Sequence, residues 1–152
     1  MLFKTKLNVV NTLKILSIFL SINVINIINY KYKINDKVNF IYIVFIILAH
    51  FLGVILNFYD KIKYYDKFVH FLFGIVASYI LSFFIKGKYK IIKIIIVVIF
   101  LATMWEIYEY ICSILFHIDP QNNLTTGVND TMQDIIVAFI GSIIAPILCR
   151  KL

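Results

Sequence analysis

Five long apolar runs, separated by short charged segments, constrain this chain more than any other feature of its sequence. At 1.5 Å per residue, a helix of about 20 residues crosses the hydrocarbon core of a bilayer, and the runs approach or exceed that length. The fifth run is short, but it becomes a full span if its helix begins near Asp130. The sequence predicts about five transmembrane helices, near residues 7–28, 38–56, 68–85, 91–116 and 130–148.

Composition agrees with this prediction. Of the 152 residues, 62% are hydrophobic and 15% are charged, and the mean hydropathy is +0.92. An ordinary soluble domain carries about a quarter charged residues, so that class is excluded. We expect an all-α fold, a polytopic integral membrane protein whose helices form a single bundle over residues 1–152. The first run is expected to remain as a helix, because it lacks the small-residue cleavage site of a signal peptide.

The net charge of +7 comes from basic residues that lie in short clusters between the apolar runs. This distribution is typical of membrane-spanning helices, whose ends attract Lys and Arg, and it argues against a nucleic-acid partner. Nine basic residues lie on the side of the membrane that carries the C-terminus, and six lie on the side of the N-terminus. The segment 117–133, on the side of the N-terminus, contains none. The positive-inside rule therefore predicts an outer N-terminus and an inner C-terminus.

Three pairs of ionisable residues lie at one end of the last three predicted helices. Within each pair the spacing is three or four residues, which places both side chains on one helix face. Because consecutive spans alternate in direction, all three pairs are expected at the same depth, near the outer face. The pairs are Asp66 with His70, Glu106 with Glu109, and Asp130 with Asp134.

Five carboxylates and an imidazole at one depth imply either protonation of some groups or a cation among them. Oxygen ligands with one imidazole suit Mg²⁺, Mn²⁺ or Ca²⁺, and Zn²⁺ also fits. Small residues on the same faces, among them Gly74 and Gly141, predict that these helices pack closely. His50 in the second span is a candidate extension of the group.

Simpler interpretations exist for several of these residues. Asp130, with Gln133 three residues later, resembles a helix N-cap, and Asp66 beside Lys67 is a favourable charge at a helix start. His50 alone on an apolar helix is typical of a buried histidine with a hydrogen-bond partner. Glu106 and Glu109 are different, because two glutamates one turn apart inside a span have no capping role.

The motifs themselves resemble a known group. D-K-x-x-H-F at Asp66–Phe71, E-x-x-E at Glu106–Glu109 and N-D-T-x-x-D at residues 129–134, followed by Gly141, are similar to the YjdF-type membrane-spanning family of bacteria. More distantly they resemble VanZ-like proteins. The VanZ pattern has Gln where this chain has Glu109, and an Arg in the last loop, where this chain has none. The resemblance implies a bacterial inner-membrane location and strengthens the choice of site residues, but it implies no particular reaction.

The leading functional hypothesis is a metal-dependent enzyme that acts on a lipid-linked or envelope substrate at the outer face. In this hypothesis Glu106, Glu109, Asp130 and Asp134 bind a divalent cation, and His70, oriented by Asp66, is the acid or base. Two alternatives stay open: an ion-coupled transporter or carrier, and a non-catalytic membrane partner protein. The sequence decides neither whether the chain is an enzyme nor its substrate or oligomeric state.

Overall fold

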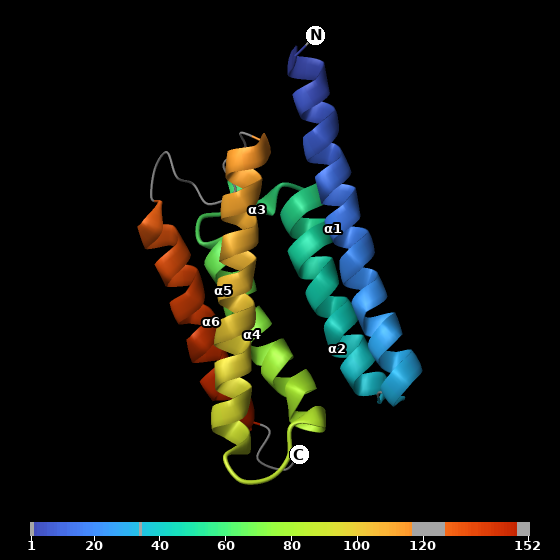
Figure 1. Cartoon of the computed structure of the whole chain (residues 1–152), viewed down its shortest axis with the longest axis vertical. Helices are drawn as coiled ribbons and strands as arrows, with labels where there is room; N and C mark the ends of the chain where they lie inside the picture. The colour runs from blue at the N-terminus through green and yellow to red at the C-terminus, as the bar shows by residue number, and fades with distance from the viewer. Residues whose placement is uncertain (1, 34, 117–126, 149–152) are drawn as a thin grey trace.

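The computed structural model describes residues 2–33, 35–116 and 127–148, and every regular element within these ranges is helical (Figure 1). Five helical segments are long and apolar enough to cross a membrane, so the predicted all-α fold with five spans is confirmed. In chain order the elements are α1 (Leu2–Tyr32), α2 (Asp36–Ile46), the π-helix η1 (Ile47–Ile55), α3 (Phe58–Lys61), α4 (Tyr65–Phe84), α5 (Lys90–Phe116) and α6 (Val128–Leu148).

The second predicted span consists of two kinds of helix joined end to end. The α-helix α2 continues directly into the π-helix η1, which contains His50 and Gly53. A Cβ atom on Gly53 would lie 2.3 Å from Cε2 of Tyr59, so only glycine allows the Tyr59 ring to lie against η1. The hydroxyl of Tyr65 also donates to the Leu48 carbonyl at 2.9 Å. The π-helix is therefore fastened to the segment that leads into α4.

The closest helix contact in the bundle joins α4 and α6. A Cβ atom on Gly74 would lie 2.1 Å from the carbonyl oxygen of Ala138, and one on Gly141 would lie 2.2 Å from that of Phe71. Such approach of two backbones requires glycine at both positions, and small residues commonly provide it between membrane helices. The predicted close packing at Gly74 and Gly141 is confirmed. This contact fixes the relative height of α4 and α6, and hence of the polar groups at their N-terminal ends.

The helix α1 lies beside α2 on the outside of the bundle (Figure 1). It is joined to α2 by the hydroxyl of Tyr42, which donates to the carbonyl of Ser21 at 2.6 Å. Large apolar side chains such as Ile15 and Phe19 are 68% and 61% exposed. In a membrane these side chains face lipid, so their exposure agrees with a spanning helix.

Candidate metal centre

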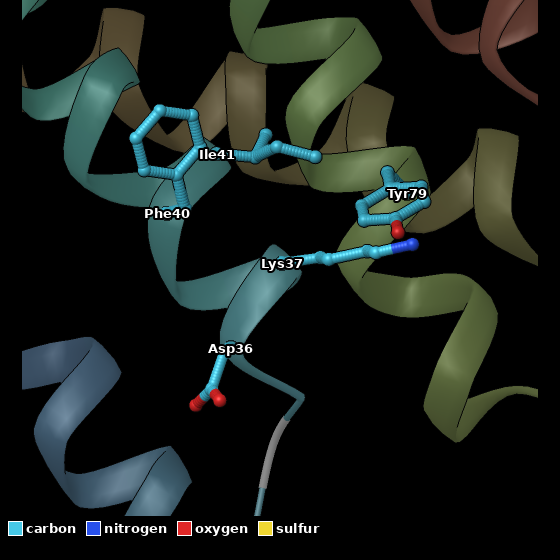
Figure 2. A pocket seen from close by; sticks show the side chains of 5 residues that line it. All are labelled: Asp36, Lys37, Phe40, Ile41 and Tyr79. Atoms are coloured by element: carbon cyan, nitrogen blue, oxygen red, sulfur yellow. The ribbon is translucent and has the colours of Figure 1, made fainter.

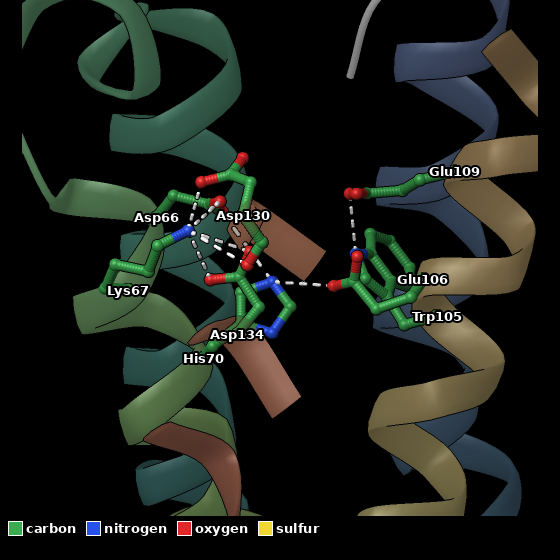
Figure 3. Close-up of polar contacts among 8 residues, drawn as sticks. All are labelled: Asp66, Lys67, His70, Trp105, Glu106, Glu109, Asp130 and Asp134. Carbon is green, nitrogen blue, oxygen red and sulfur yellow. Dashed lines mark hydrogen bonds and ion pairs between the residues drawn. The ribbon is translucent and has the colours of Figure 1, made fainter. Parts of the chain in front are cut away.

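Charged side chains from α4, α5 and α6 meet at one end of the bundle, where α4 and α6 begin and α5 ends (Figures 1 and 3). Both α4 and α6 begin before the apolar runs that define them in the sequence, because their first turns carry the polar residues of the site. The residues drawn together in Figure 3 are Asp66, Lys67, His70, Trp105, Glu106, Glu109, Asp130 and Asp134.

A lysine lies at the centre of the acidic group. The ammonium nitrogen of Lys67 is 2.5 Å from Oδ1 of Asp130 and 2.9 Å from both carboxylate oxygens of Asp134. Oδ2 of Asp66 is 3.8 Å away. The Lys67 side chain is only 14% exposed. Lys67 therefore supplies a partly buried positive charge that joins α4 to α6 and neutralises part of the acidic group.

The imidazole of His70 lies between carboxylates of two helices. Its Nε2 atom is 3.6 Å from Oδ1 of Asp66, on the preceding turn of α4, and 3.7 Å from Oε1 of Glu106 on α5. Both His70 and Glu106 are buried. His70 and Asp66 are therefore neighbours, as the spacing predicts, and Glu106 places α5 beside the same imidazole.

Three of these residues have the geometry of a small metal-binding group. Asp66, His70 and Asp134 each offer one ligand atom, and the three atoms lie within 4.8 Å of one another. Because no two of these atoms are more than 4.8 Å apart, one point lies within about 2.8 Å of all three, compared with the 2.0–2.6 Å typical of Mg²⁺ and Ca²⁺ ligands. Small side-chain movements would close that difference.

The carboxylate of Asp134 is buried beside the Lys67 ammonium. The Asp134 side chain is 3% exposed, and the Lys67 ammonium donates to Oδ2. Oδ1 is buried and accepts no hydrogen bond from the described residues. The Lys67 ammonium nitrogen nevertheless lies 2.9 Å from Oδ1, so its positive charge is adjacent to both oxygens of this carboxylate.

The remaining predicted ligands lie at different distances from this group. Asp130 contacts Lys67 from inside α6, so it is a residue of the first turn and not the N-cap that its spacing from Gln133 resembles. Glu109 accepts a hydrogen bond from Nε1 of Trp105 at 2.7 Å, and its carboxylate lies farther along α5 than that of Glu106 (Figure 3). The ligand set of Glu106, Glu109, Asp130 and Asp134 stays a prediction.

His50 lies elsewhere. Its Nε2 atom is 2.9 Å from Oγ of Ser21, across the interface between η1 and α1. This contact agrees with the simpler interpretation, a buried histidine with a hydrogen-bond partner.

Two residues of the site were not identified from the sequence. Lys67 was given no role there beyond its place beside Asp66 and in the D-K-x-x-H-F motif, although its spacing of three residues from His70 places both on one face of α4. The second is Tyr59 on α3. Burial raises the pKa of its hydroxyl, and the negative charges of Asp66, Glu109 and Asp134 add to that effect. Tyr59 therefore remains a neutral hydroxyl beside the acidic group.

Fold and site define a class: a multi-pass helical membrane protein with a buried cluster of acidic residues, one histidine and one lysine where three helices meet. Within that class, the family described as "Predicted membrane protein (DUF2238)" matches residues 2–152, and the chain belongs to this family. It is similar to an uncharacterized protein of the bacterium Thermotoga maritima, with 29% identity over 115 residues. That match covers 70% of this chain and 58% of the relative, so the chain spans little more than half the relative's length. No solved structure matches the chain.

Proposed function

We propose that this protein binds a divalent cation at Asp66, His70 and Asp134 and uses it on a lipid-linked or envelope substrate. The observation that carries the proposal is the convergence of the three ligand atoms within 4.8 Å, on two helices held at a fixed height. The proposal places the site at the outer face of a bacterial inner membrane, because segment 117–133 lacks Lys and Arg.

This assignment revises the roles expected from the sequence. Because the imidazole of His70 has carboxylates on both sides, we assign it to the cation. Glu106, 3.7 Å from His70 and outside the ligand group, is then the candidate proton acceptor. A divalent cation would lower the pKa of a bound water or neutralise a phosphate. The Lys67 ammonium would stabilise further negative charge on the substrate. A substrate in the headgroup region fits a site at the helix ends.

A metal titration of the purified protein tests the proposal. We expect calorimetry with Mn²⁺ to show one site, and we expect Asp134→Asn and His70→Gln to abolish it. Glu109→Gln is the matched control, since Glu109 bonds to Trp105 and is outside the proposed ligand group. Equal titration curves for the unaltered protein and Asp134→Asn would end the proposal. Loss of binding in Glu109→Gln and Asp134→Asn, with binding retained in His70→Gln, would favour the ligand set expected from the sequence.

The contact of Lys67 with Asp130 and Asp134 favours a second candidate, in which the cluster only fastens α4 to α6. The protein would then be a non-catalytic membrane partner. In this case we expect no metal binding. We also expect variants of the cluster to affect function only to the extent that they lower the amount of folded protein.

A further inference from the structure

A groove between α2 and α4 opens at the other end of the bundle from the candidate metal centre. It has a volume of about 380 Å³ and is lined by Asp36, Lys37, Phe40, Ile41 and Tyr79. Lys37 extends from the first turn of α2 toward Tyr79 on α4, while the Asp36 carboxylate points away from both (Figure 2). The groove therefore presents one ammonium and one phenol group above an apolar wall.

The spacing of the α2 residues gives this wall a direction. Lys37, Phe40, Ile41 and Val44 recur at intervals of three and four residues, so they form one stripe along the helix. Phe40 is 68% exposed and Val44 is 39% exposed, whereas Val38 on another face is fully buried. The stripe runs from a charged group at the membrane surface into the apolar depth of the bilayer, which is also the order of headgroup and acyl chain in a lipid.

The surrounding charge selects the sign of the headgroup. The end of α1 and the segment between α4 and α5 lie at this end of the bundle (Figure 1), and the rings of Tyr32 and Phe84 are 5.1 Å apart. Asp36 is the only acidic residue among the first 59. The basic residues of this end are Lys31, Lys33, Lys37, Lys86, Lys88, Lys90 and Lys93. Such a concentration of ammonium groups attracts anionic headgroups.

We propose that the groove between α2 and α4 binds an anionic phospholipid. The phosphate contacts Lys37 and the Tyr79 hydroxyl, and an acyl chain lies along Phe40 and Ile41. The site is independent of the candidate metal centre, since it shares no residue with it.

Native mass spectrometry of the purified full chain tests this assignment. The probes are dioleoylphosphatidylglycerol and dioleoylphosphatidylcholine, added separately. The unaltered protein is expected to retain phosphatidylglycerol more strongly. Lys37→Met is expected to weaken its retention about fivefold, the effect typical of one basic residue at an anionic surface. Tyr79→Phe should weaken it less, and Lys37→Arg should preserve it. Lys93→Met is the matched control, because Lys93 is exposed at the same end but does not line the groove.

Equal retention of the two lipids by the unaltered protein would overturn the assignment without any variant. An equal loss in Lys37→Met and Lys93→Met would also overturn it, since that result indicates a diffuse surface charge. Glycerol 3-phosphate provides a further control. Competition at the same concentration as the lipid would identify a site for a soluble phosphate, whereas no competition supports the lipid.

Discussion

The ammonium of Lys67 on α4 lies 2.9 Å from the carboxylate of Asp134 on α6, and the two side chains are 14% and 3% exposed. This contact identifies a cation that the acidic group already contains. The sequence implies that clustered carboxylates need positive charge or protonation, and Lys67 supplies part of it. The ligand atoms of Asp66, His70 and Asp134 also lie within 4.8 Å of one another, which is why a second cation is proposed beside Lys67.

Removal of the Lys67 charge should destabilise the protein. In Lys67→Met the buried carboxylates of Asp130 and Asp134 lose their ion pairs, and breaking a buried pair costs about 3–5 kcal/mol. We expect a lower midpoint of thermal unfolding in detergent. We also expect Mn²⁺ to raise this midpoint more in Lys67→Met than in the unaltered protein. Lys63→Met is the control, because Lys63 is exposed outside the site. An unfolding midpoint equal to that of the control would show that the Lys67 contacts contribute no stability.

A side chain at Gly141 should separate α4 from α6. Its Cβ would lie 2.2 Å from the Phe71 carbonyl oxygen, and a backbone atom cannot move aside as a flexible side chain can. Gly141→Val is expected to lower the free energy of unfolding by at least the 1–3 kcal/mol typical of overpacking. Ile140→Val places the same side chain on the neighbouring exposed position and should change little. Chemical denaturation in mixed micelles measures both, and similar values for the two would contradict this packing.

The alkaline stability of the protein should depend on Tyr59. Its pKa is raised in the folded protein above the ordinary value near 10, so ionisation favours the unfolded chain. The stabilising contribution is complete below about pH 10 and is lost as the pH rises further. Tyr59→Phe should lose less stability than the unaltered protein between about pH 9 and 11. Tyr64→Phe, at an exposed position of the same connection, is the control. Parallel pH profiles for all three proteins would rule out this role of Tyr59.

The sequence predicts those features that depend on one helix at a time. Hydropathy locates the five spans, and spacing places Asp66 with His70, Glu106 with Glu109, and Asp130 with Asp134 on shared helix faces. The bundle end at which they meet follows from the alternating direction of consecutive spans. Because α4 and α6 approach through Gly74 and Gly141, both helices also begin at one height.

Other features depend on contacts between helices and could not be predicted in this way. The role of Lys67 requires the first turns of α4 and α6 to be adjacent, and the position of Tyr59 requires a glycine on η1 opposite its ring. The π-helix itself has no periodic signature in an apolar run, because nearly every residue there is hydrophobic. Its contacts with Tyr59 and Tyr65 are visible only in three dimensions.

An anomalous-scattering map of the protein crystallised with Mn²⁺ tests directly whether Asp66, His70 and Asp134 bind a cation. We expect a peak between the side chains of Asp66, His70 and Asp134, at about 2.0–2.6 Å from an atom of each. A map with no peak at this position, or with a peak only beside Glu109, would contradict this prediction.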